Sequence, residues 1–496
     1  MDRRGEIRLC CVGDHGRVVL PALDDYRVGP TGLRGLRLIH THLKGEGLTE
    51  DDLTDLALLR LDLVAAVTVE ADGSPGVVHG AHLVPENPQG RQWAFLRPAR
   101  PGELDLDFLA FIRALEDDLS RQQRTREVDA RERAFLIRVE TAPGADPEGS
   151  LAELAELARS AGVRVFDRTV QYRDALDPRY VMGRGRLSDV VIRALQMGAN
   201  LLIFDHELTP AQVRSIGEFT QLKVIDRTQL ILDIFAQRAH SREGKIQVEL
   251  AQLRYLLPRL TGKGTALSRL AGGIGARGPG ETKLEIDRRR IRDRIHLLEK
   301  ALRDIEKARG QRRHRRERTG LPIVSIVGYT NAGKSTLLNS LTRSSVLAED
   351  RLFATLDPKS SRLRFPRDTE ALVTDTVGFI RDLPQELFAA FRATLDELRD
   401  AHLLLHVVDI ANPSFADQIA AVERIIAHLD LADKPMVRVF NKMDRFPDRD
   451  LLGDLCRRYD AVAVSALDQG TLMPLLERLE PVVRDLGRQS RAGETP

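Results

Sequence analysis

The fold class follows from one segment, Ile323-Val-Ser-Ile-Val-Gly328-Tyr-Thr-Asn331-Ala-Gly333-Lys334-Ser335-Thr336. An apolar run leads into the pattern G-x-x-x-x-G-K-[ST], and a helix-like apolar run, residues 337–341, follows it. A strand, a glycine loop and a helix in this order cradle phosphates, because the glycines let backbone N–H groups face phosphate oxygens. Lys334 supplies charge for the outer phosphates, Ser335 offers a hydroxyl to Mg²⁺, and the helix N-terminus adds its positive dipole end. The segment predicts a nucleoside triphosphate site in an α/β fold.

Three further segments, each at the end of an apolar run, complete a guanine-nucleotide site. The first, residues 375–378, reads D-x-x-G, in which Asp375 would hold Mg²⁺ through water and the Gly378 N–H would meet the γ-phosphate. The second, residues 441–444, ends in Asp444, whose carboxylate accepts the guanine N1–H and N2–H₂ that adenine lacks. The third, residues 465–467, offers a backbone N–H to guanine O6. Because ligands of an open parallel sheet bind at the carboxyl ends of its strands, these segments predict a GTP-binding domain.

Three residues bear on hydrolysis. Thr355 is the candidate switch threonine that completes the Mg²⁺ shell only when the γ-phosphate is present. Phe379 follows Gly378 at the position where GTPases of the Ras type carry a water-orienting glutamine, so slow intrinsic turnover is expected. Asn331 is a candidate K⁺ ligand beside the phosphates, and its alternative role is to tie the loop together.

The complete expected site contains three groups of residues. The catalytic residues are Lys334, Thr355 and Gly378. The metal ligands are Ser335, Thr355 and, through water, Asp375. The nucleotide-binding residues are Gly328, Tyr329, Thr330, Asn331, Ala332, Gly333, Lys334, Ser335, Thr336, Phe353, Ala354, Thr355, Leu356, Asp357, Asp375, Thr376, Val377, Gly378, Phe379, Asn441, Lys442, Met443, Asp444, Ser465, Ala466 and Leu467.

Length and composition limit the remaining possibilities. A chain of 496 residues is too long for one core, and 42% hydrophobic with 30% charged residues is a globular composition. The formal net charge of +2 means that any nucleic-acid contact must come from local patches. Three cysteines cannot form a disulfide framework, and no apolar stretch is long enough to span a membrane. We expect a cytoplasmic protein, with peripheral membrane association left open.

The region before the nucleotide site divides into three parts. Residues 1–125 predict an α/β extension, with strands at 7–12, 17–20 and 63–69 and a helix capped by Thr49. Residues 131–238 alternate between strand and helix patterns and predict a small parallel sheet covered by helices, including a helix opened by a Ser150–Glu153 capping box. Residues 239–318 carry apolar positions spaced four and three apart in two runs, which predict an antiparallel helical hairpin. The polar stretch 121–126 is interpreted as a linker, and residues 319–488 form the GTPase domain.

Two features of these regions are candidate binding sites. The hairpin loop, residues 261–280, is glycine-rich and basic, and the second helix ends in a basic run, so contact with RNA phosphates is favoured over a solvated linker. In the extension, His40 and His42 precede an aspartate in Thr49-Glu-Asp-Asp52, a ligand set for zinc. Packing of the two histidines at a strand end is the favoured interpretation, and a zinc site is the alternative.

In these motifs, residues 131–488 resemble the HflX family of translation-factor-related GTPases. The resemblance rests on G-Y-T-N-A-G-K-S-T (328–336), F-A-T-L-D (353–357), D-T-V-G-F (375–379), N-K-M-D (441–444) and the glycine-rich segment 272–285. It implies GTP-dependent binding to the large ribosomal subunit and its RNA, with rescue or splitting of stalled or idle ribosomes. The alternative is a regulatory GTP switch that acts on a protein partner. The short hairpin runs favour a monomer.

Overall fold

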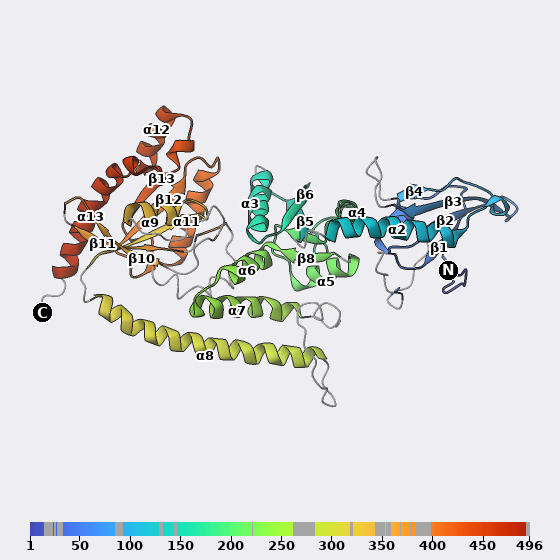
Figure 1. Ribbon diagram of the computed structural model, residues 1–496, viewed down its shortest axis with the longest axis horizontal. Helices are drawn as coiled ribbons and strands as arrows, with labels where there is room; N and C mark the ends of the chain where they lie inside the picture. Colours follow the sequence, from blue (N-terminus) through green and yellow to red (C-terminus); the bar gives the residue numbers. More distant parts are fainter. Residues whose placement is uncertain are drawn as a thin grey trace. The chain divides into compact units, whose positions relative to one another are not determined.

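The computed structural model describes residues 1–13, 23, 26, 33–84, 93–127, 132–142, 146–220, 222–260, 283–317, 321–342, 353, 359–367, 369–376, 378–381 and 398–492. Contacts within the chain divide it into two units. One contains residues 1–147 and 162–225, and the other contains residues 148–161 and 226–496 (Figure 1).

The first unit begins with a four-stranded sheet. Its strands, in sheet order, are β1 (Arg37–His42), β2 (Leu63–Val69), β3 (Pro75–Leu83) and β4 (Trp93–Phe95). β1 and β2 are parallel, and their connection contains α1 (Glu50–Leu58), while β3 and β4 add antiparallel pairs. The apolar sides of α1 and α2 (Phe108–Glu127) share one core with these strands. Thr49 caps α1 by accepting the Asp52 N–H, as its sequence predicts.

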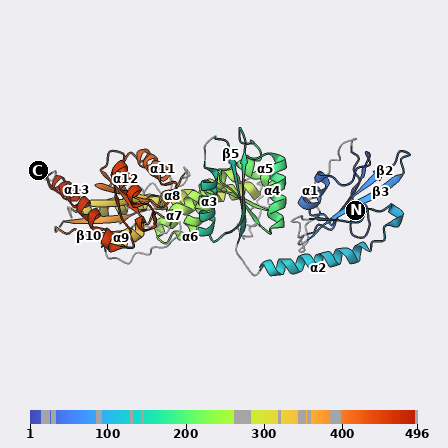
Figure 2. The same ribbon diagram turned by 90° about the horizontal axis from the view of Figure 1, so that it is seen from above.

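A second four-stranded sheet completes this unit. Its strands, in sheet order, are β6 (Arg164–Tyr172), β5 (Arg133–Glu140), β7 (Leu201–Phe204) and β8 (Lys223–Asp226). β5 is parallel to β6 and to β7, which confirms the predicted parallel sheet. α4 (Arg184–Gln196) and α5 (Pro210–Phe219) pack apolar side chains against β5 and β7. Figure 2 shows this sheet with α4 and α5 beside it.

The second unit contains a helical part and a GTPase-type sheet. The helices are α3 (Pro147–Ser160), α6 (Arg227–Arg238), α7 (Arg242–Leu256) and α8 (Lys283–Glu317). α7 and α8 pack against each other, and ion pairs join Arg254 to Glu299 and Arg294 to Glu249. Figure 1 shows α8 running back alongside α7, and Arg288 near the start of α8 donates to the Leu260 carbonyl oxygen just after α7 at 2.7 Å, so the pair is antiparallel, which confirms the predicted hairpin. Its basic tip, residues 261–280, lies outside the described residues.

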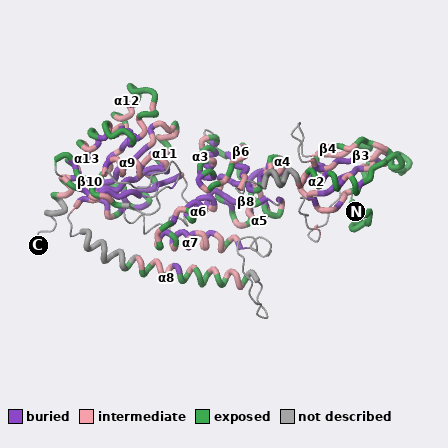
Figure 3. The backbone as a smooth tube through the Cα atoms, viewed as in Figure 1, coloured by how far each residue is buried: buried purple, intermediate pink, exposed green. Residues whose placement is uncertain are grey.

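Six strands form the sheet of this unit. In sheet order they are β10 (Lys359–Arg364), β11 (Glu370–Asp375), β9 (Ile323–Gly328), β12 (Leu403–Asp409), β13 (Met436–Asn441) and β14 (Ala461–Ala463). All adjacent pairs are parallel except β10 with β11. Alternate residues face two cores, one with α9 (Lys334–Thr342) and α13 (Met473–Ala492), the other with α11 (Phe415–His428) and α12 (Arg449–Tyr459). Figure 3 shows the central strands buried between these helices.

Three local predictions were wrong. Residues 7–12 form no strand, and Ile7 and Val12 are exposed, because an apolar run without a partner strand cannot form a sheet. The polar stretch 121–126 continues α2 and is not a linker, since its residues are good helix formers. Ser150 does not cap α3, which begins at Pro147, a favoured first helical residue. The predicted strand at 17–20 lies outside the described residues.

No helix in the described ranges is long and apolar enough to cross a membrane.

Candidate nucleotide-binding site

The loop between β9 and α9 has backbone φ angles and close contacts that only particular residue types can adopt. Gly328 and Gly333 have φ values of 152° and 88°. A Cβ added to Gly328 would lie 2.2 Å from the Val407 carbonyl oxygen, and one on Gly333 would lie 2.2 Å from Asn441 Nδ2. Asn331 has a φ of 62°, in the left-handed region that asparagine adopts more readily than most residues. These backbone requirements give the loop the tight turn expected of a phosphate cradle.

Lys334 begins α9 and is buried, and its Nζ donates to the Tyr329 carbonyl oxygen at 2.8 Å. Burial lowers the pKa of Lys334 to about 8, against the opposing effect of the Asp375 carboxylate. A buried ammonium group is suited to an anionic ligand, because a phosphate would compensate its lost hydration.

Asp375 ends β11 and lies beside the start of α9. The Ser335 Oγ donates to Asp375 Oδ2 at 2.6 Å. A hydroxyl and a carboxylate in contact are oxygen donors of the kind that Mg²⁺ prefers, so the residues present fit the ion. Thr330 Oγ1 is buried and, among the described residues, has no hydrogen-bond partner. The loop therefore offers a polar atom as well as charge to a ligand.

The segment after Asp375 is held on the loop by backbone hydrogen bonds. The Phe379 N–H donates to the Gly328 oxygen at 3.1 Å, and the Thr330 N–H donates to the Phe379 oxygen at 2.7 Å. A Cβ on Gly378 would lie 2.9 Å from Lys334 Nζ, so a side chain there would enter the space of the lysine. The Phe379 side chain is 2% exposed and belongs to the protein interior.

One amide joins the loop to the segment predicted to contact the base. Asn441 ends β13, its Nδ2 donates to the Ala332 oxygen at 2.8 Å, and its Oδ1 accepts the Ala466 N–H at 2.9 Å. Lys442 has a φ of 62°, and its Nζ donates to Asp409 Oδ2 at 2.7 Å. Asp444 lies in the short 3-10 helix Met443–Arg445 and is exposed to solvent. The structure thus brings all four predicted segments to one edge of the sheet.

Part of the expected site cannot be placed. Ala354, Thr355, Leu356, Asp357 and Val377 lie outside the described residues. Phe353 is described and is buried, with its ring centroid 4.6 Å from that of Phe235 on α6. Its aromatic contact is with the helical part of the same unit.

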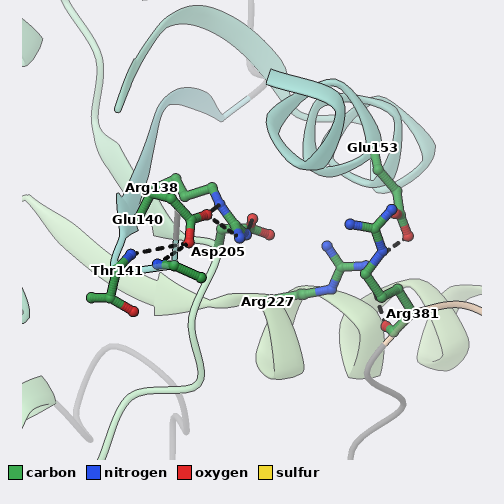
Figure 4. A network of polar contacts seen from close by, with 8 residues as sticks. Arg138, Glu140, Thr141, Glu153, Asp205, Arg227 and Arg381 are labelled. Atoms are coloured by element: carbon green, nitrogen blue, oxygen red, sulfur yellow. Dashed lines mark hydrogen bonds and ion pairs between the residues drawn. The ribbon is translucent and has the colours of Figure 1, made fainter. Parts of the chain in front are cut away.

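Sequence reasoning missed a polar network that contacts the phosphate loop. The Tyr329 hydroxyl donates to Glu153 Oε1 on α3 at 2.8 Å and accepts the Arg381 N–H at 2.7 Å. The Arg227 guanidinium on α6 is 2.6 Å from the same Glu153 oxygen and 3.4 Å from the Arg381 carbonyl oxygen (Figure 4). The signal available was a tyrosine inside the loop, but no local pattern could identify a partner 176 residues away.

A separate ion-pair cluster lies in the first unit. Arg138 on β5 contacts Glu140 at 2.7 Å and Asp205 at 2.6 Å, and Glu140 also accepts the N–H groups of residues 141 and 142 (Figure 4). These donors keep the pKa of Glu140 below its usual range despite burial, which by itself acts to raise it. We interpret this cluster as structural, because each carboxylate is matched by donors.

Three family models match consecutive regions of the chain. A model described as "GTP-binding GTPase N-terminal" matches residues 148–236, and one described as "GTP-binding GTPase Middle Region" matches residues 238–316. A third, "50S ribosome-binding GTPase", matches residues 323–442.

Curated relatives agree with these matches. GTPase HflX of Caldanaerobacter subterraneus subsp. tengcongensis is 48% identical over 314 residues, which cover 63% of this chain and 73% of that protein. GTPase HflX of Lacrimispora saccharolytica is 46% identical over 71% of this chain and 84% of its own length. The Escherichia coli protein of the same name is 47% identical over 64% of this chain and 75% of its own.

The fold and the matched regions define a P-loop GTPase with an N-terminal and a middle region before its GTPase domain. The chain belongs to the HflX family of GTPases. It also continues N-terminally beyond the three family models, which begin at residue 148.

Proposed function

We propose that the GTP-bound protein binds the large ribosomal subunit and its RNA and splits or rescues stalled or idle ribosomes, and that hydrolysis ends the interaction. The observation that carries this proposal is the match of residues 323–442 to a family of 50S ribosome-binding GTPases. The antiparallel hairpin of α7 and α8 supports it, because α8 exposes arginines such as Arg290 and Arg292 that suit phosphate contact.

In this proposal each part of the loop has a separate task. The loop N–H groups and the Lys334 ammonium bind the β- and γ-phosphates, and Gly378 leaves room for the γ-phosphate beside Lys334. Ser335 and Asp375 would hold Mg²⁺, joined by Thr355, and the ion would neutralise charge on the phosphate oxygens. Asp444 selects guanine, with Asn441 holding the adjacent segments in position.

Water orientation needs a group other than the side chain after Gly378. Phe379 is buried and apolar, so it can neither accept nor donate a proton. We propose that K⁺, held with the help of the Asn331 side chain, supplies positive charge beside the phosphates. Hydrolysis should then be faster in KCl than in NaCl at equal ionic strength, and Asn331→Ala should remove the difference. Equal rates for the wild-type protein in the two salts would contradict this role.

Co-sedimentation with purified 50S subunits tests the ribosome proposal directly. The protein should pellet with subunits in the presence of a non-hydrolysable GTP analogue and remain in the supernatant with GDP. Sucrose gradients of 70S ribosomes should show a shift to free subunits with the analogue. Binding that is equal with both nucleotides would overturn the proposal, and no binding at moderate salt would favour a regulatory switch acting on a protein partner.

A further inference from the structure

The N-terminal extension contains a cluster of metal-ligand side chains. His40 and His42 are alternate residues of β1 and therefore lie on the same face of the sheet. Asp52 lies in the first turn of α1. Thr49 caps this helix and fixes the orientation of its first turn. One ligand atom from each of the three residues lies within 4.8 Å of the others.

We propose that His40, His42 and Asp52 form a site for a zinc-class divalent metal ion, with an open coordination position for water. His40 Nε2 is 3.2 Å from Asp52 Oδ1, and His42 Nε2 is 3.5 Å from Asp52 Oδ2. Ligands on a tetrahedral zinc ion, with bonds of about 2.0–2.1 Å, lie about 3.3 Å from one another. The two His–Asp distances therefore fit one shared ion.

The hydrogen bonds of His42 determine which ring nitrogen carries the proton. His42 Nδ1 lies 2.9 Å from the Gly47 carbonyl oxygen and 3.2 Å from that of Glu46. Since both neighbours can only accept, Nδ1 carries the hydrogen, which leaves Nε2 as the ring nitrogen that can bind a metal ion beside the Asp52 carboxylate. A cation between this nitrogen and the carboxylate oxygen would be held by both.

The other two ligands are also oriented for a metal ion. His40 Nε2 is buried and, within the described part of the chain, has no hydrogen-bond partner although Asp52 Oδ1 is close. Asp52 Oδ2 accepts the Thr49 N–H at 2.7 Å and the Thr49 hydroxyl at 2.8 Å. Contacts of this kind behind metal ligands fix their direction and raise affinity.

The cluster lies close to the surface of the extension. The side chains of His40, His42 and Asp52 are 14%, 12% and 13% exposed, so none is sealed in the interior. Three protein ligands with one open position is the arrangement of zinc sites that bind water or a substrate, whereas structural zinc sites use four protein ligands.

Metal analysis of the full-length, untagged protein tests the site. The protein is stripped with chelator, saturated with Mg·GDP so that the nucleotide site is filled, given one equivalent of Zn²⁺ and desalted. The wild-type protein and the control His296→Ala, which replaces a histidine side chain that is 86% exposed, should each retain about one zinc ion per chain. His42→Ala and Asp52→Asn should bind zinc at least about tenfold more weakly.

Two controls distinguish loss of the metal site from loss of folding and from metal binding by cysteines. Asp52→Asn retains an oxygen that can cap α1, so its circular dichroism and GDP affinity should match the wild type. Co²⁺ in place of Zn²⁺ should give visible bands of a nitrogen and oxygen site, whereas thiolate charge-transfer bands would show that cysteines bind the ion instead. Thiolate bands, failure of the wild type to bind zinc, or equal binding by the variants would each overturn the proposal.

Discussion

At the scale of single residues, the geometry of the nucleotide site depends on a few residues that no other amino acid can replace. Asn441 holds two loops through one amide, and Gly378 leaves space beside Lys334 that any side chain would fill. Glycine patterns and motif spacing identified these positions in the sequence. Their partners, such as the Ala332 oxygen, came only from the folded chain.

Asp444 is exposed, so its replacement should change specificity without loss of folding. Asp444→Asn removes the carboxylate that accepts two guanine N–H groups, and an amide instead matches the additional carbonyl of xanthine. We expect GTP affinity to fall by at least about tenfold, because an unpaired donor costs 1–3 kcal/mol, and xanthosine triphosphate affinity to rise. Competition binding of the two nucleotides measures both changes, and an unchanged GTP affinity would refute the base-reading role.

Lys334 should make GTP binding depend on pH. Its pKa in the nucleotide-free protein is lowered to about 8 by burial, and bound phosphates raise the pKa of an adjacent ammonium group. Affinity should be constant below pH 8 and should fall above it by up to about tenfold per pH unit, because binding then requires uptake of a proton. Calorimetry at pH 8.5 in buffers of different ionisation enthalpy measures that uptake.

Lys334→Arg is the control for this measurement, because a guanidinium keeps its proton throughout this range. The variant should bind nucleotide without proton uptake. Uptake by the variant equal to that of the wild type would assign the titration to another group.

At the scale of elements, α3 contacts the phosphate loop through Glu153, and α6 contacts Glu153 through Arg227. Tyr329 lies in the loop, Glu153 on α3, and Arg381 follows the D-x-x-G segment. Burial, together with the charge and the hydrogen bond of the Glu153 carboxylate, raises the pKa of the Tyr329 phenol, so the phenol stays protonated and donates to the carboxylate. A change in the segment after Gly378 would reach α3 through these bonds.

Tyr329→Phe should destabilise the protein by about 1–3 kcal/mol, because Glu153 and the Arg381 N–H each lose a partner. A double-mutant cycle with Glu153→Gln, followed by urea unfolding, should give a coupling energy of at least about 0.5 kcal/mol. Tyr172→Phe is the matched control, since Tyr172 is 72% exposed and should change stability by less than about 0.5 kcal/mol. Additive effects of the two substitutions would show that the contact is not energetically coupled.

His406 on β12 should make the GTPase sheet sensitive to acid. The side chain is buried between strands, and burial, with smaller effects of Arg438 and Lys334, lowers its pKa to about 3. The unfolded chain takes up this proton near pH 6.5 and the folded chain only near pH 3. The free energy of unfolding should therefore fall by about 1.4 kcal/mol per pH unit as the pH drops through this window.

His406→Gln should reduce this slope in urea unfolding measured at pH 7, 6 and 5. The control His296→Gln changes an exposed histidine and should leave the slope unchanged. If both variants follow the wild type, the acid sensitivity belongs to other groups.

At the scale of the whole molecule, the three matched regions and the extension suggest a division of tasks. The GTPase domain matches a ribosome-binding family, and the hairpin of α7 and α8 precedes it in the chain. The formal net charge is only +2, so RNA contact has to come from local arginines. Ribosome binding should consequently depend on salt.

The slope of log affinity for 50S subunits against log KCl concentration measures the number of phosphate contacts. Arg290→Gln and Arg292→Gln, at exposed positions of α8, should each weaken binding and reduce the slope by about 1. Arg449→Gln, an exposed arginine on α12, is the matched control and should change neither quantity. An unchanged slope in all three variants would exclude α8 from the interface.

The sequence by itself determined the nucleotide fold, the parallel sheet before it and the helical hairpin. Strand and helix periods and the glycines of a phosphate loop are local properties that a linear pattern records. Only the tertiary structure showed that Glu153 contacts the phosphate loop, that Arg227 contacts Glu153, and that Asp52 faces both histidines of β1. These contacts join residues of different elements, and no spacing along the chain specifies which side chains the packing of helices and strands brings together.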